Sequence, residues 1–191
     1  MEYSHLLRDA DLKALRAVLG HPVVLLYART VDVRQHVVMA SYFSLDLGGG
    51  GHYCVVESDW NDTPQTYLDY HMIAVTLQDW PKGVARARPD VSEAATGRWW
   101  PGGDALGHPS VVHPDGQHGV VDHIKVLEHR AASDSESVHY DHALVFGFAD
   151  GYRFSLSAHK SIWGGLEFSE QESALQQLCD EYPERLHLGP E

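Results

Sequence analysis

The chain has 191 residues, of which 43% are hydrophobic, and these values indicate one globular domain with a sizeable core. Its 14 lysines and arginines are outnumbered by 27 aspartates and glutamates, which gives a formal net charge of −13. This charge repels nucleic acid and anionic membranes, so neither is expected as a partner. The two cysteines are far apart and have the spacing of neither a disulfide scaffold nor a metal-binding motif. The first segment does not resemble a signal peptide. Both observations predict a cytoplasmic protein.

The first predicted element is a helix over residues 5–19, where apolar residues recur at helical spacing. Strands dominate the next part of the chain. Apolar patterns predict strands over 23–31, 37–47, 52–58 and 66–77. The four glycines at 48–51 lack the spacing of a phosphate-binding loop, so they indicate a hairpin loop between two of these strands.

Residues 82–118 differ from the segments on either side. They are rich in glycine, proline and alanine, and no apolar period persists through them. Irregular segments of this length are uncommon inside compact domains and are often functional. We therefore expect a long irregular insertion at about 82–118, after which a strand over 119–129 resumes the regular structure.

The strongest local pattern lies near the end of the chain. Apolar residues alternate over 142–149 and again over 152–158, on either side of Asp150-Gly151, which predicts a β-hairpin within one sheet. A short strand is expected over 163–169. Ser169 and Glu172 have the spacing of a capping box, which would begin a C-terminal helix ending before Pro183.

Together these elements predict a single α+β domain over residues 1–191. The strands follow one another without the regular alternation of helices that a parallel sheet requires. A largely antiparallel, curved β-sheet is therefore expected, packed by an N-terminal and a C-terminal helix.

A histidine-rich stretch, HPSVVHPDGQHGVVDH at 108–123, is the first candidate site. His108, His113 and His118 are spaced five residues apart, and Asp115 lies among them. Zinc sites usually contain two histidines that are closer in sequence, on one helix or one strand. The five-residue spacing found here does not hold the imidazole rings in a tetrahedral arrangement. We therefore expect a solvated loop that is sensitive to pH and no cofactor; a metal site formed by these four residues is the alternative.

A second candidate is the run His139-Tyr140-Asp141-His142. On a strand, His139 and Asp141 would share one face, and Tyr140 and His142 the other. A histidine–aspartate pair can orient a general base. Because no serine or cysteine motif accompanies the pair, a polar strand entrance is favoured, and a hydrolase with a His/Asp site, metal-assisted or not, is the alternative.

The third candidate is a pair of tryptophans inside the insertion. Trp99 and Trp100 stand among glycines and prolines that cannot cover their rings. Tryptophan is enriched among the residues that dominate binding energy at protein interfaces. We therefore expect Trp99, Trp100, Asp104 and His108 to contact a partner. A ring folded back into the core, or an aromatic cleft for a small ligand, are the alternatives.

Residues 140–169, YDHALVFGFADGYRFSLSAHKSIWGGLEFS, resemble the corresponding part of small uncharacterised bacterial proteins of the toxin-immunity type. The resemblance implies a β-rich, acidic, noncatalytic protein that binds one partner. A basic toxin would suit the negative charge of this chain. The expected function is therefore that of a noncatalytic, cytoplasmic protein-binding module.

Overall fold

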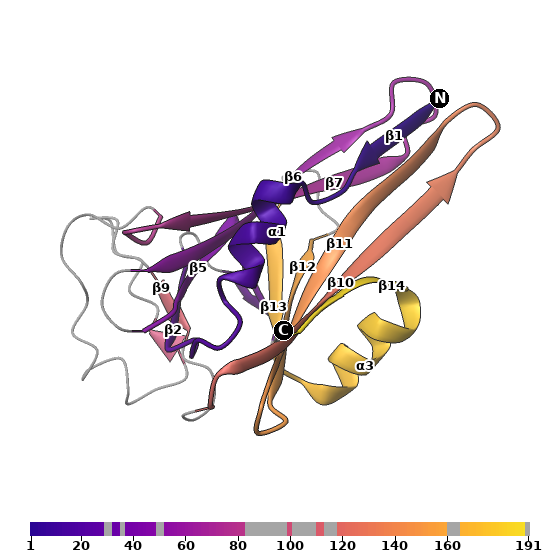
Figure 1. Cartoon of the computed structure of the whole chain (residues 1–191). Coiled ribbons are helices and arrows are strands. Elements are labelled where there is room, and N and C mark those ends of the chain that lie inside the picture. The colour runs from indigo at the N-terminus through magenta and orange to yellow at the C-terminus, as the bar shows by residue number, and fades with distance from the viewer. Residues whose placement is uncertain are drawn as a thin grey trace.

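In the computed structural model, two packed β-sheets form the body of the protein, and two helices lie against them in the part of the chain that is described (Figure 1). The helices are α1 (Asp9–Arg16) and α3 (Glu172–Glu181). The described residues are 1–28, 32–34, 37–48, 52–82, 99–100, 110–112, 118–159 and 165–189.

The larger sheet, sheet A, has the strand order β14-β10-β11-β12-β13-β4-β3, and β1 pairs with β11 beside this path. Its strands are β1 (Glu2–His5), β3 (Asp32–Arg34), β4 (Val37–Ala40), β10 (Val121–Ala132), β11 (Ser137–Phe148), β12 (Arg153–Ala158), β13 (Leu166–Ser169) and β14 (Glu184–Leu188). Sheet B has the order β7-β6-β5-β2-β9-β8. Its strands are β2 (Leu25–Ala28), β5 (Tyr42–Asp46), β6 (Tyr53–Asp62), β7 (Asp69–Gln78), β8 (Trp99–Trp100) and β9 (Ser110–Val112).

The core lies between the two sheets because their strands alternate apolar and polar residues. On β12, Phe154 and Leu156 are fully buried in this core. Phe43 of sheet B meets Phe168 of sheet A with ring centroids 6.2 Å apart. Leu15 of α1 joins the same core, whereas α3 packs on the outer face of sheet A through a second, smaller cluster.

The structure confirms an α+β fold in which the sheets are mostly antiparallel; only β1 and β11 pair in parallel among the described strands. The predicted hairpin is also confirmed. Its strands are β11 and β12, neighbours in sheet A, and Leu144 pairs with Leu156. Gly151 adopts a φ of +90°, which a residue with a side chain rarely tolerates, so the turn depends on this glycine.

Several local expectations were wrong. Residues 37–47 form two strands in different sheets, β4 and β5, because the chain crosses between the layers at Ser41. Residues 2–5 are a strand, so the helix expected over 5–19 is limited to α1. The Ser169 capping box does not form: Gln171 is the residue before α3, and no side chain caps this end. The strand β14 was not expected at all.

Two buried carboxylates fix the start of α1 against both sheets. The side chain of Asp141 on β11 is 1% exposed. Its carboxylate accepts a hydrogen bond from the backbone N–H of Leu7 at 2.6 Å. The guanidinium of Arg185 on β14 donates two further hydrogen bonds to it, at 2.6 and 2.7 Å, and so forms a bidentate ion pair. Asp11 of α1 accepts the backbone N–H of Val75 on β7 at 3.0 Å. Buried charges persist only with such partners, so these contacts define how the elements meet.

No helix in the described ranges is both long and apolar enough to cross a membrane.

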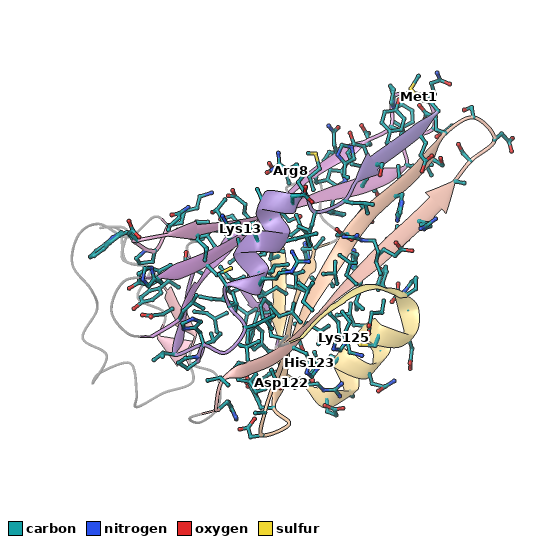
Figure 2. All side chains as sticks on the ribbon, viewed as in Figure 1. Met1, Arg8, Lys13, Asp122, His123 and Lys125 are labelled. Carbon is teal, nitrogen blue, oxygen red and sulfur yellow. The ribbon has the colours of Figure 1, made fainter. Side chains whose placement is uncertain are left out.

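Replacement of Arg185 tests the Asp141 ion pair. Arg185→Leu leaves a buried carboxylate without its counter-charge and should lower the free energy of unfolding by about 3–5 kcal/mol. The control is Arg8→Leu, because Arg8 pairs with the other buried carboxylate, Asp11, but lies on the outer surface with a side chain 79% exposed (Figure 2). That change should cost at most about 1 kcal/mol. Equal losses in the two variants, measured by urea denaturation, would contradict this assignment.

Candidate functional site

Two of the four residues of the expected partner contact, Asp104 and His108, lie outside the described part of the chain. Trp99 and Trp100 make up the short strand β8, which lies at the edge of sheet B and pairs with β9. The structure describes no side chain at either tryptophan. Whether these four residues contact a partner therefore stays a prediction.

The histidine-rich stretch is described only from His118 onward, apart from the backbone of β9, so His113 and Asp115 also lie outside the described residues. The His118 ring stacks on Tyr152 with centroids 3.5 Å apart, and its Nδ1 lies 2.8 Å from a carboxylate oxygen of Asp150. Hydrogen bonds from His118 and from the backbone lower the pKa of Asp150. His118 thus packs against the β11–β12 turn. The described residues contain no group of three or more potential ligands that could hold a metal ion.

His139 and Asp141 do not form the His/Asp pair considered as a general base. The Nε2 atom of His139 lies 2.7 Å from the carboxylate of Glu128 on β10, which also accepts a hydrogen bond from Arg130 at 3.0 Å. Asp141 is bound by Arg185 and by the backbone of Leu7. Each group is thus held by a different partner.

A cluster of three histidines and two tyrosines lies on β7, β10, β11 and the end of α3; the sequence indicated only that Tyr140 and His142 would share a strand face. Its members are His71, His129, Tyr140, His142 and Tyr182. The rings of His142 and Tyr182 stack with centroids 3.9 Å apart, and Tyr140 lies 5.2 Å from His129 and 5.6 Å from His71. We call these residues the His/Tyr cluster.

Within the His/Tyr cluster, burial favours the uncharged forms of His71 and Tyr140. Burial lowers the pKa of His71, and His129 and His159 lower it further against the opposing effect of Asp69. Burial, with Tyr182 and Asp69, raises the pKa of Tyr140. No described residue hydrogen-bonds the buried Nδ1 atom of His71. The ring contacts of the cluster supply packing energy, and His71 on β7 joins sheet B to the residues of sheet A.

A projection at one end of the molecule is the more informative feature. β1 and the outer ends of β6, β7, β10 and β11 extend together beyond α1 and α3 (Figure 1). We call residues 1–5, 58–73 and 128–141 the arm. Its interior is a small apolar cluster built around Tyr70, Val138 and Tyr140. Its tip consists of two turns, 63–68 between β6 and β7, and 133–136 between β10 and β11.

The buried side chain of Glu136 locks these two turns together. Its Oε2 atom accepts hydrogen bonds from the backbone N–H and the hydroxyl of Thr66, both at 2.8 Å, and from the backbone N–H of Gln65 at 3.2 Å. Burial alone would raise the pKa of this carboxyl. Hydrogen bonds from Thr63, Thr66 and the backbone outweigh burial and lower the pKa to about 2. The ionised form therefore holds the tip in one conformation.

Tyr67 projects from this locked turn. Its side chain is 72% exposed, the largest exposure of any tyrosine among the described residues, and its backbone has a φ of +53°. A left-handed conformation costs a bulky residue roughly 1–2 kcal/mol, so glycine or asparagine would normally stand there. Strain of this kind persists only where the surroundings impose it, and it is concentrated at functional sites.

The β6–β7 hairpin of the tip also carries two facing negative charges, while the Met1 ammonium donates a hydrogen bond to the backbone of Ser135 in the other turn. Asp62 and Asp69 are paired directly across the β6–β7 hairpin, an arrangement in which like charges destabilise a sheet. Asp69 accepts a hydrogen bond from the Trp60 indole at 3.0 Å, which relieves part of this repulsion. Neither segment 57–73 nor segment 131–141 contains a lysine or arginine. The sequence offered one signal for the turn, Thr63-Pro64, but none for the exposed Tyr67.

Acid titration tests the role of Glu136. A carboxyl whose pKa is lowered in the folded state stabilises that state above its unfolded pKa, near 4.5, and loses this contribution as the pH falls toward 2. The stability difference between the wild type and Glu136→Gln should therefore be full above about pH 5 and shrink toward pH 2. Urea denaturation at several pH values measures it. A difference that does not change with pH would overturn the role, and Glu172→Gln, an exposed glutamate of α3, is the control.

The arm tip is the candidate functional site, because it combines an exposed tyrosine in a strained backbone conformation, two paired aspartates and a turn held by Glu136. Comparisons of the chain with protein-family models, with curated proteins and with solved structures found no match.

Proposed function

We propose that this chain is a noncatalytic, cytoplasmic protein-binding module that takes a basic partner at the tip of its arm. The observation that carries the proposal is Tyr67, an exposed phenol ring held in a strained conformation by a turn locked onto Glu136. Tyrosine is among the residues enriched in binding hot spots. A frame that is already ordered loses little conformational entropy on binding, which favours affinity.

The charges at the tip support a basic partner. A lysine or arginine of the partner between Asp62 and Asp69 would relieve the repulsion across the hairpin. The same cation could contact the face of the Tyr67 ring, a favourable arrangement for ammonium and guanidinium groups. The net charge of −13 would also speed association with a basic protein at low ionic strength.

The resemblance of residues 140–169 to proteins of the toxin-immunity type agrees with this proposal, since such a protein would inhibit a basic toxin by binding it. Trp99, Trp100, Asp104 and His108 stay a predicted second contact region. A hydrolase with a His/Asp site has less support, because His139 and Asp141 bind other residues.

Two variants separate a binding role of the tip from a folding role. Tyr67→Gly removes the ring and the strain, so the free energy of unfolding should stay unchanged or rise by about 1 kcal/mol, because relief of strain outweighs the entropy cost of glycine. Affinity for the partner should fall about thirtyfold, a loss of about 2 kcal/mol that is typical of a hot spot. Asp62→Asn should likewise stabilise the hairpin slightly and weaken binding.

The partner would be captured from cells that produce the protein, identified and purified, and its affinity measured by calorimetry at two salt concentrations. Leu77→Ala is the matched control, since Leu77 lies on the same hairpin far from the tip and is 46% exposed. This variant should bind as the wild type does. Undiminished affinity of Tyr67→Gly and Asp62→Asn, or a large loss of stability in either, would rule out the tip as the binding surface.

A further inference from the structure

A buried histidine, His71, lies where β7 of sheet B meets β11 of sheet A. The residue is 2% exposed, and it is the member of the His/Tyr cluster that comes from sheet B. Its ring meets Tyr140 and His142 of β11, with centroids 5.6 and 6.4 Å away. The contact between the two sheets at this point therefore includes a side chain that can take up a proton near neutral pH.

His71 differs from other histidines of the described chain because no carboxylate hydrogen-bonds it. Four histidines each have a ring nitrogen within 3.3 Å of a carboxylate oxygen, namely His118, His123, His139 and His187. The buried Nδ1 atom of His71 has no hydrogen-bond partner among the described residues. A protonated imidazole carries an N–H on both nitrogens. Protonation of His71 would therefore leave a buried charge, and a buried donor without an acceptor.

The groups that face His71 from the other elements make protonation still less favourable. They are His142 of β11, His129 of β10 and His159, which follows β12, and any positive charge on these rings repels a proton on His71. Asp69, on the same strand, acts in the opposite direction, but its side chain is exposed. Burial, with His129 and His159, outweighs Asp69 and lowers the pKa of His71.

The direction of the pH dependence follows from this lowered pKa. Neutral His71 stabilises the junction in full above the unfolded value of 6.5, and this contribution is lost as the pH falls toward the lower folded value. In that window one such histidine shifts an opening equilibrium by up to about tenfold per pH unit. The arm tip behaves differently, because Glu136, with a pKa of about 2, stays ionised there.

We infer that His71 makes the junction between the arm and the body sensitive to acid: its protonation separates β7 from β11 at the His/Tyr cluster, while Glu136 continues to hold the arm tip. Histidine clusters at interfaces are a common basis of conformational change on acidification. The inference does not depend on a partner at Tyr67, since it concerns the base of the arm.

Thiol labelling at Ser58 tests this inference. Ser58 is 5% exposed and pairs with Ile73, so it lies on the same face of the β6–β7 hairpin as His71. Its hydroxyl has no hydrogen-bond partner among the described residues, so Ser58→Cys introduces a buried thiol at little cost. Cys54, fully buried on the same strand but within the body core, is the internal control. Cys179→Ser removes the partly exposed thiol of α3.

The labelling rate at Ser58→Cys is compared with and without His71→Phe, which keeps a ring but cannot be protonated. The ratio of the two rates cancels the pH dependence of the thiol itself. It should rise by up to about tenfold between about pH 7.5 and about pH 5.5. The same ratio at Cys54 should stay within about twofold, as should the ratio obtained with His187→Gln, a histidine whose side chain is 51% exposed. His71→Gln replaces His71→Phe if that variant does not fold.

A ratio at Ser58→Cys that does not change with pH would overturn the inference. An equal rise at Cys54 would also overturn it, because acid would then act on the whole fold, and so would an equal effect of His187→Gln. The amide of Thr66, which donates a hydrogen bond to Glu136, reports on the tip. Its NMR chemical shift should stay constant over this pH range, and a large shift would contradict the claim that the tip stays closed.

Discussion

The arrangement of this protein depends on the buried carboxylate of Asp141. This group lies on β11, the strand that the body and the arm share, and it binds the start of α1 through Leu7 and the last strand through Arg185. A buried charge must have partners, and here the partners come from the two ends of the described chain. Asp11 makes the corresponding contact to β7 in the other sheet. The direction in which the arm leaves the body follows from these two contacts and from the His/Tyr cluster.

The arm tip shows a conflict between stability and exposure. An ionised Glu136 holds the turn firmly, and that turn presents a tyrosine in a backbone conformation better suited to glycine. Two aspartates are also paired across the hairpin where unlike charges would be more stable. Folding alone explains neither choice. The strained tyrosine and the facing aspartates are both explained if a cationic side chain of another protein binds at the tip, because natural proteins commonly give up stability at binding sites.

Local features of the fold could be predicted from the sequence, and non-local ones could not. The hairpin around Gly151 has its turn and both alternating strands within a short segment. The break at Ser41 has no such signal, since the apolar alternation is similar on both sides and only the change of sheet separates β4 from β5. The His/Tyr cluster brings His71 to Tyr140 from different sheets. Tyr67 gave no signal either, because its conformation is imposed by Glu136 and Thr66, at the tips of two hairpins.

Photo-crosslinking from the tip tests the central claim most directly. A benzophenone amino acid would replace Tyr67 and, in a separate variant, Leu77, which is also exposed but lies on the body end of β7. Irradiation in the cells that produce the protein is expected to join position 67 to one protein, at a peptide rich in lysine or arginine, and to leave position 77 without that product. Adducts at position 77 with none at position 67, or adducts at 67 spread over many unrelated acidic and neutral proteins, would contradict the assignment of the arm tip as the partner-binding surface.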